Sequence, residues 1–145
     1  MNSAMTKPLD TFWLDFSLRH PSCEPESITA ALNLKPLSAS RSGSKVGAAT
    51  RRFTHWMCKF REGIGDEDFA RSLEEVLSFH DASTDFFHQF IASGGEVEVA
   101  INQVIKMDDG ILFKLTLDHE FLKACGERQI SLRVQAWSVE EELSD

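Results

Sequence analysis

The segment FWLDFSL, residues 12–18, is the clearest structural signal in the chain. Its apolar and polar residues alternate with a period of two, which is typical of a strand with one face buried against a core. The buried row is Phe12, Leu14, Phe16 and Leu18. His20-Pro21 interrupts the alternation, and Pro25 is well placed as the first residue of a helix. The segment therefore predicts a strand followed by a helix.

The same alternation returns four times along the chain, in residues 52–60, 96–102, 111–117 and 130–136. Helical spacing of apolar residues predicts helices that start near Asp66, Ser83 and Asp118, with Asp66 and Asp118 as capping residues. Asp108-Asp109-Gly110 predicts a hairpin turn between the third and fourth strands. Alternation in every strand implies a sheet covered by helices on one face only. The predicted fold is therefore α+β, with a mixed or antiparallel sheet of about five strands and ferredoxin-like β-α-β elements.

The periodic elements predict one domain over residues 10–138, a length ordinary for a single core. Residues 1–9 are expected to be a flexible N-terminus, and residues 139–145 an acidic C-terminal tail. Residues 38–52, SASRSGSKVGAATRR, are small, basic and aperiodic, and so predict a loop.

Charge is distributed unevenly, because residues 1–61 carry a net +5 and residues 62–145 a net −13. The total of −8 disfavours nucleic acid as a partner, since phosphates would be repelled. An acidic surface suits a basic protein partner, although acidity also serves solubility alone.

Cysteine usage and hydropathy predict a cytoplasmic protein. Cys23, Cys58 and Cys125 are odd in number and widely spaced, which argues against a disulfide framework. The chain holds no apolar run of the roughly 18 residues that a membrane helix needs. Residues 1–8 lack the apolar core of a secretory signal, so no membrane association is expected.

The order of several landmarks resembles a bacterial family catalogued as domain of unknown function 4279. These landmarks are the strand 12–18, Pro25-Glu26-x-Ile28, Leu32-x-Leu34-x-Pro36, Gly43, Trp56 and the closing segment 111–137. Trp137 stands where that family usually has a tyrosine. The resemblance covers about residues 10–137 and implies a shared fold and a bacterial origin. It implies no activity and provides no catalytic residues to transfer.

Two constellations could carry chemistry. His20 with Cys23, and His55 with Cys58, form a doubled His-x-x-Cys set of the kind that binds zinc. However, residues three apart in one strand point to opposite faces, so neither a metal nor a cofactor is expected. Asp118-His119-Glu120 with Cys125 could form a nucleophilic site, but the acids fit a helix cap and first turn, and the thiol falls on an apolar face. No catalytic residue is assigned.

Two groups of residues are candidate binding sites. Arg41, Lys45, Arg51 and Arg52 lie in a segment without acids, which could bind a phosphorylated ligand or could be a solvated loop. Trp13, Met57 and Trp137 fall on the sheet face opposite the core rows. Exposed large side chains there predict an interface, for which a homodimer is the hypothesis, unless the protein's own loops or helices cover them.

The sequence thus favours a non-enzymatic interaction module, an immunity-type or regulatory partner of a basic protein. Two alternatives stay open. The first is a binder of a phosphorylated ligand through residues 38–52. The second is a small hydrolase or transferase that uses His20, His55 or His119.

Overall fold

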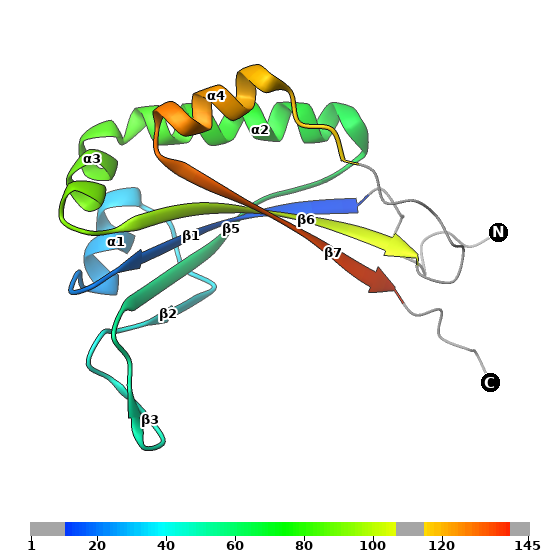
Figure 1. Ribbon diagram of the computed structural model, residues 1–145. Coiled ribbons are helices and arrows are strands. Elements are labelled where there is room, and N and C mark those ends of the chain that lie inside the picture. Colours follow the sequence, from blue (N-terminus) through cyan, green and yellow to red (C-terminus); the bar gives the residue numbers. More distant parts are fainter. Residues whose placement is uncertain (1–10, 107–114, 140–145) are drawn as a thin grey trace, which may run out of the picture.

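The computed structural model describes residues 11–106 and 115–139 of the chain. These residues form a five-stranded mixed sheet with its helices packed on one face (Figure 1). The helices are α1 (Pro25–Leu32), α2 (Gly65–Ala82), α3 (Thr84–Ala92) and α4 (His119–Glu127). The predicted α+β fold with helices on one face of the sheet is therefore confirmed.

Three of the four strand pairings in the sheet are antiparallel. The strands are β1 (Thr11–His20), β2 (Ser38–Ser40), β5 (Thr54–Ile64), β6 (Glu96–Lys106) and β7 (Ile130–Val139), and their order in the sheet is β2-β5-β1-β6-β7. Only β7 is parallel, because α4 carries the chain back across the sheet before β7 pairs with β6. Two short strands, β3 (Lys45–Val46) and β4 (Ala49–Thr50), form a separate hairpin.

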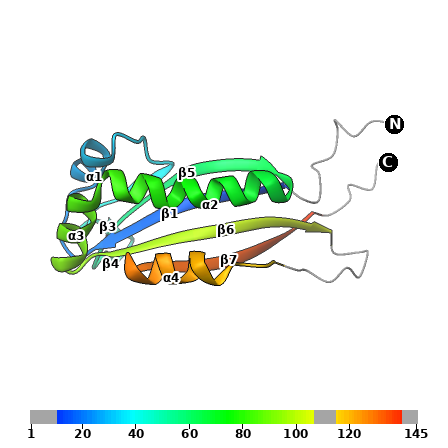
Figure 2. The ribbon, with the colours of Figure 1, turned by 90° about the horizontal axis from the view of Figure 1, so that it is seen from above.

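The core lies between the sheet and the helices, as the alternation of residues 12–18 predicts. The buried row of β1 meets that of β5 and an aromatic cluster from α2 and α3. Trp56 is only 1% exposed, and its indole N–H donates to the Thr29 hydroxyl oxygen at 3.0 Å, which fastens α1 to β5. Figure 2 shows α2 over the middle of the sheet and α4 over β7.

The strand predicted over residues 111–117 is wrong in the part that the structure describes. Leu115 and Leu117 belong to no strand, yet both pack against the core. Their alternation reflects burial on one side of the chain, which does not require a hydrogen-bonded neighbour. β6 is already flanked by β1 and β7. The predicted turn at Asp108-Asp109-Gly110 lies outside the described residues.

The loop predicted over residues 38–52 is also wrong, because this segment contains β2, β3 and β4. Gly43 and Gly47 adopt φ values of 84° and 62°, a region that favours glycine and that lets the chain turn tightly. Gly43 N–H donates to the Arg51 carbonyl at 2.8 Å, and Arg51 N–H donates to the Ser44 carbonyl at 2.9 Å. Strands this short and exposed leave no alternation in the sequence.

One of the two predicted helix caps is confirmed. The Asp118 carboxylate accepts the Glu120 N–H at 2.7 Å and caps α4. Asp66 does not cap α2, since the helix already starts at Gly65, whose φ of 86° turns the chain directly out of β5. Asp68 instead accepts the Ile64 N–H at 3.1 Å.

Candidate functional site

The sheet face opposite the helices is the candidate site, because no helix among the described residues lies on it. The outward rows of all five strands meet there. Its β1 row runs Trp13, Asp15, Ser17 and Arg19. We call this surface the uncovered face.

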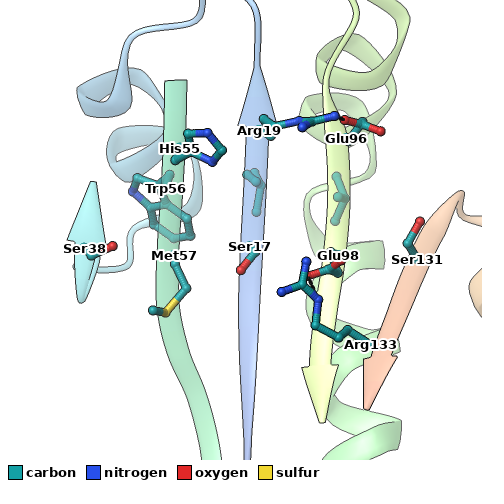
Figure 3. Close-up of a pocket in the computed structure, with 12 residues that line it drawn as sticks. Ser17, Arg19, Ser38, His55, Trp56, Met57, Glu96, Glu98, Ser131 and Arg133 are labelled. Atoms are coloured by element: carbon teal, nitrogen blue, oxygen red, sulfur yellow. Dashed lines mark hydrogen bonds and ion pairs between the residues drawn. The ribbon is translucent and has the colours of Figure 1, made fainter. Parts of the chain in front are cut away.

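A polar hollow of about 540 Å³ occupies one end of the uncovered face (Figure 3). Two ion pairs cross it, Arg19 with Glu96 and Arg133 with Glu98, the second at 3.2 Å. The Arg19 guanidinium also lies 4.5 Å from the centre of the Phe53 ring. The residues labelled around the hollow are Ser17, Arg19, Ser38, His55, Trp56, Met57, Glu96, Glu98, Ser131 and Arg133; the side chain of Trp56 itself points to the helix side.

The polar hollow offers paired charges and hydroxyl groups. Each of the two carboxylates is held in an ion pair by a guanidinium. Within the described part of the chain, no hydrogen bond joins His55 to a carboxylate or to a hydroxyl that it could activate. The hollow is a surface of balanced charge with hydroxyl groups around it.

A pair of tryptophans lies at the other end of the uncovered face. The ring centres of Trp13 and Trp137 are 5.9 Å apart with an interplanar angle of 31°. Trp137 is 48% exposed. Its indole N–H donates to the Asn102 side-chain oxygen at 2.8 Å. A large exposed aromatic group is therefore held in one orientation.

Asn102 is 1% exposed, and its side chain forms hydrogen bonds to both tryptophans and to Asp15. Its amide group donates to the Asp15 Oδ2 at 3.1 Å and to the Trp13 carbonyl at 3.2 Å. Burial raises the pKa of Asp15, an effect that the Asn102 bond and the charge of Lys59 partly offset. Asp15 Oδ1 is buried and has no hydrogen-bond partner in the described structure. Burying these polar groups costs free energy. In return, the hydrogen bond to Asn102 fixes the orientation of the Trp137 indole.

The structure brings together two of the three predicted interface residues. Trp13 and Trp137 are in contact, whereas Met57 pairs with Ser17 and lines the polar hollow. Ser17 is four positions along β1 from Trp13, about 13 Å at the usual rise per residue. Met57 and the tryptophan pair are therefore separate parts of the same face.

The four predicted basic residues differ in their ion pairing within the described structure. Arg41 is bound to Glu24, at 3.0 Å, and to Glu26, both beside the start of α1. Lys45, Arg51 and Arg52 are exposed on or beside the β3–β4 hairpin, and no ion pair holds them within the described residues. In Figure 1 this hairpin projects from the side of the sheet away from α2 and α4.

The residues of the doubled His-x-x-Cys set do not come together: His20 forms other hydrogen bonds, and His55 and Cys58 lie on opposite faces of β5. Nδ1 of His20 accepts the N–H groups of Ser22 and Cys23, at 3.0 and 2.8 Å, so Nε2 carries the hydrogen and donates to the Ser93 hydroxyl at 2.9 Å. His55 is exposed while Cys58 is buried, so they point to opposite faces, as strand geometry predicts. The described residues contain no group of three metal-ligating side chains.

Neither buried thiol is an activated nucleophile. Burial raises the pKa of Cys58 to about 11, and burial likewise raises the pKa of Cys125 to about 11. A thiol in this state is protonated near neutral pH and reacts slowly. In the predicted group of Asp118, His119, Glu120 and Cys125, Asp118 therefore caps α4 and Cys125 is a core residue.

The sequence did not reveal the role of Asn102, its bond to Asp15 or the two ion pairs. A signal for Asn102 was present, because its neighbours in the outward row of β6, Ala100 and Val104, are apolar and buried. Buried apolar residues in an outward row indicate that other side chains cover that row. Here Trp13, opposite Asn102 in β1, and Trp137, which bonds to Asn102, flank it.

Within the described residues, the helices on the opposite side of the sheet carry a net negative charge. Helices α2, α3 and α4 contain nine Asp and Glu residues and two Lys and Arg residues.

None of the described helices is long and apolar enough to cross a membrane.

Comparison with curated proteins and with solved structures found no match. The model of one protein family, described as Domain of unknown function (DUF4279), matches residues 10–139. This range includes all five strands of the sheet, the four helices and the uncovered face. The chain therefore belongs to the DUF4279 family.

Proposed function

We propose that this protein is a non-enzymatic interaction module of the bacterial cytoplasm that binds a protein partner through the uncovered face, with Trp137 as its main anchor. The observation that carries the proposal is the buried Asn102 that fixes an indole 48% exposed. Energetically dominant residues of interfaces are often tryptophans. A side chain that is already ordered loses little conformational entropy on binding.

The composition of the uncovered face supports a protein as the ligand. The tryptophan pair offers an apolar contact, and the polar hollow offers paired charges and hydroxyl groups beside it. Protein interfaces combine these features, an aromatic centre within a polar surround. A small-molecule site would be more enclosed and more apolar.

The net charge supports a basic partner, as expected for an immunity-type or regulatory protein. The negative charge of α2, α3 and α4 gives the molecule a field that attracts a basic protein from a distance. Such a field raises the rate of encounter, while contacts at the uncovered face set the lifetime of the complex. The partner's binding should therefore weaken as salt concentration rises.

Affinity capture from the native cell tests the proposal. Immobilised wild-type chain should retain a partner that the Trp137→Ala variant loses by tenfold or more. Leu122→Ala is the matched control, because Leu122 is a large side chain with 45% exposure on α4, on the other side of the sheet. Equal retention by wild type and Trp137→Ala would contradict the proposal.

Binding of a phosphorylated ligand by the β3–β4 hairpin is a second candidate function. It is favoured by the exposure of Lys45, Arg51 and Arg52 without ion pairs among the described residues. A titration with phosphopeptide should then shift the amide resonances of this hairpin, and a triple substitution of these residues by glutamine should abolish the shift. Unchanged resonances would exclude this candidate.

A further inference from the structure

The two edges of the sheet differ in length. At one edge lies β2, with three residues. At the other lies β7, with ten residues, and within residues 11–106 and 115–139 no strand lies beyond it. A long edge strand presents a row of backbone N–H and C=O groups that can pair with another chain.

The sequence of β7, ISLRVQAWSV, lacks the features that usually prevent such pairing. It contains no proline, glycine or lysine, and its one charged residue, Arg133, is tied to Glu98 of β6 at 3.2 Å. Val134 on the helix side is 43% exposed, and Trp137 is exposed on the uncovered face. Leu122, on the helix that packs over β7, is exposed as well. Apolar groups therefore surround an edge that has hydrogen-bonding capacity.

We propose that a second copy of this chain pairs with β7, antiparallel and about a twofold axis at Val134, so that two sheets join into one of ten strands. A twofold axis normal to the sheet makes adjacent edge strands antiparallel and keeps both helix layers on the same side. The proposal does not rest on the function proposed above.

The side chains of β7 are complementary to themselves in this register. On the helix side, Val134 faces its own copy and Leu132 faces Ala136 of the second copy. On the uncovered face, the opposing pairs are Arg133 with Gln135 and Ser131 with Trp137. In the other pairs each larger side chain meets a smaller or polar one, and no like charges oppose each other. An axis at Arg133 would instead bring two guanidinium groups together, which is unfavourable.

Pairing at this edge uses the backbone and leaves both uncovered faces accessible on one side of the joined sheet. Each copy carries a net charge of −8, so repulsion opposes assembly and added salt should strengthen the dimer. This salt response is opposite in sign to the one expected for binding a basic partner. The two proposals can therefore fail independently.

Sedimentation of the full chain at tens of micromolar is the first test. The wild type should sediment as a dimer, and Val134→Lys should raise the dissociation constant at least tenfold while circular dichroism shows the fold unchanged. Leu37→Lys is the control, because Leu37 is a highly exposed hydrophobic residue outside β7 and its variant should remain dimeric. A wild type that is monomeric at all concentrations would overturn the proposal.

Disulfide trapping tests the register. In a Cys23→Ser background, Val134→Cys should form a cross-linked dimer under mild oxidation, since opposed residues have Cβ atoms about 5 Å apart. Ala136→Cys is the matched control, because in this register the two copies of residue 136 lie four positions apart along the strand, about 14 Å. Cross-linking at 136 but not at 134 would overturn the proposed axis.

Discussion

Replacing Asn102 with alanine should destabilise the protein, and the size of the loss should depend on pH. Asn102 is almost fully buried and makes side-chain hydrogen bonds to Trp137, to Asp15 and to the Trp13 carbonyl. The bond to the Asp15 carboxylate is worth about 1.5–3 kcal/mol and a neutral bond about 1 kcal/mol, while some freed groups regain water. We therefore expect the free energy of unfolding at pH 7 to fall by about 2–4 kcal/mol.

The pH dependence follows from Asp15. Burial raises its pKa in the folded protein, and loss of the Asn102 donor should raise that pKa further. An acid with a raised folded pKa destabilises the fold once pH exceeds its unfolded value, about 4. The cost of Asn102→Ala should therefore be smaller at pH 3.5, where Asp15 is mostly protonated in both states, than at pH 7.

Urea denaturation followed by circular dichroism at the two pH values measures this difference. Ser131→Ala is the control on the same face, with an expected effect within about 0.5 kcal/mol. Equal costs of Asn102→Ala at pH 3.5 and pH 7 would refute the idea that Asn102 stabilises the half-buried Asp15 carboxylate. A cost below about 0.5 kcal/mol at both would refute the network as a whole.

Three further predictions concern the core and its borders. Trp56→Ala should lower the free energy of unfolding by about 3–5 kcal/mol in urea titrations, because Trp56 is fully buried beneath α1; a midpoint that hardly moves would contradict this packing. The free energy of unfolding of the wild type should decline as pH falls below about 6.5, because burial lowers the pKa of His20 and its neutral ring is the form that binds Ser93. A His20→Asn variant should show a smaller decline. An identical decline in the variant would show that another group causes it. Gly95→Ala should lower the melting temperature, because a Cβ there would lie 2.4 Å from the Phe90 ring and 2.6 Å from the Phe90 carbonyl oxygen. Gly126→Ala is the control and should not lower it, because Gly126 has open space around it. Equal melting temperatures for the two variants would refute the close approach of Gly95 to Phe90.

Much of the fold could be predicted because one-sided burial leaves a period of two in the sequence. Phe12 to Leu18 and Thr54 to Phe60 show it clearly, and the structure buries the expected rows. The parallel pairing of β7 could not be read in this way, since alternation tells which face is buried but not which strand is the neighbour. Leu115 and Leu117 show the same limit, because they alternate and pack on the core without belonging to a strand.

The candidate site was harder to predict, because it depends on contacts between distant segments. Trp13 and Trp137 could be assigned to one face from their positions in two strands, but their contact requires β1, β6 and β7 to be adjacent. The role of Asn102 depends on the same order of strands. Arg41 could not be separated from the other basic residues, because its partners Glu24 and Glu26 approach it only when α1 is packed.

The affinity of the captured partner for variants of the uncovered face tests the central claim most directly. Trp137→Ala should raise the dissociation constant about 30-fold or more, corresponding to the 2 kcal/mol or more expected of a dominant interface residue. Leu122→Ala should leave it unchanged within about twofold, since that side chain lies on the opposite side of the sheet. A partner that binds Trp137→Ala as tightly as wild type, and loses affinity only when acidic residues of α2 are replaced, would show that the helix side is the binding surface.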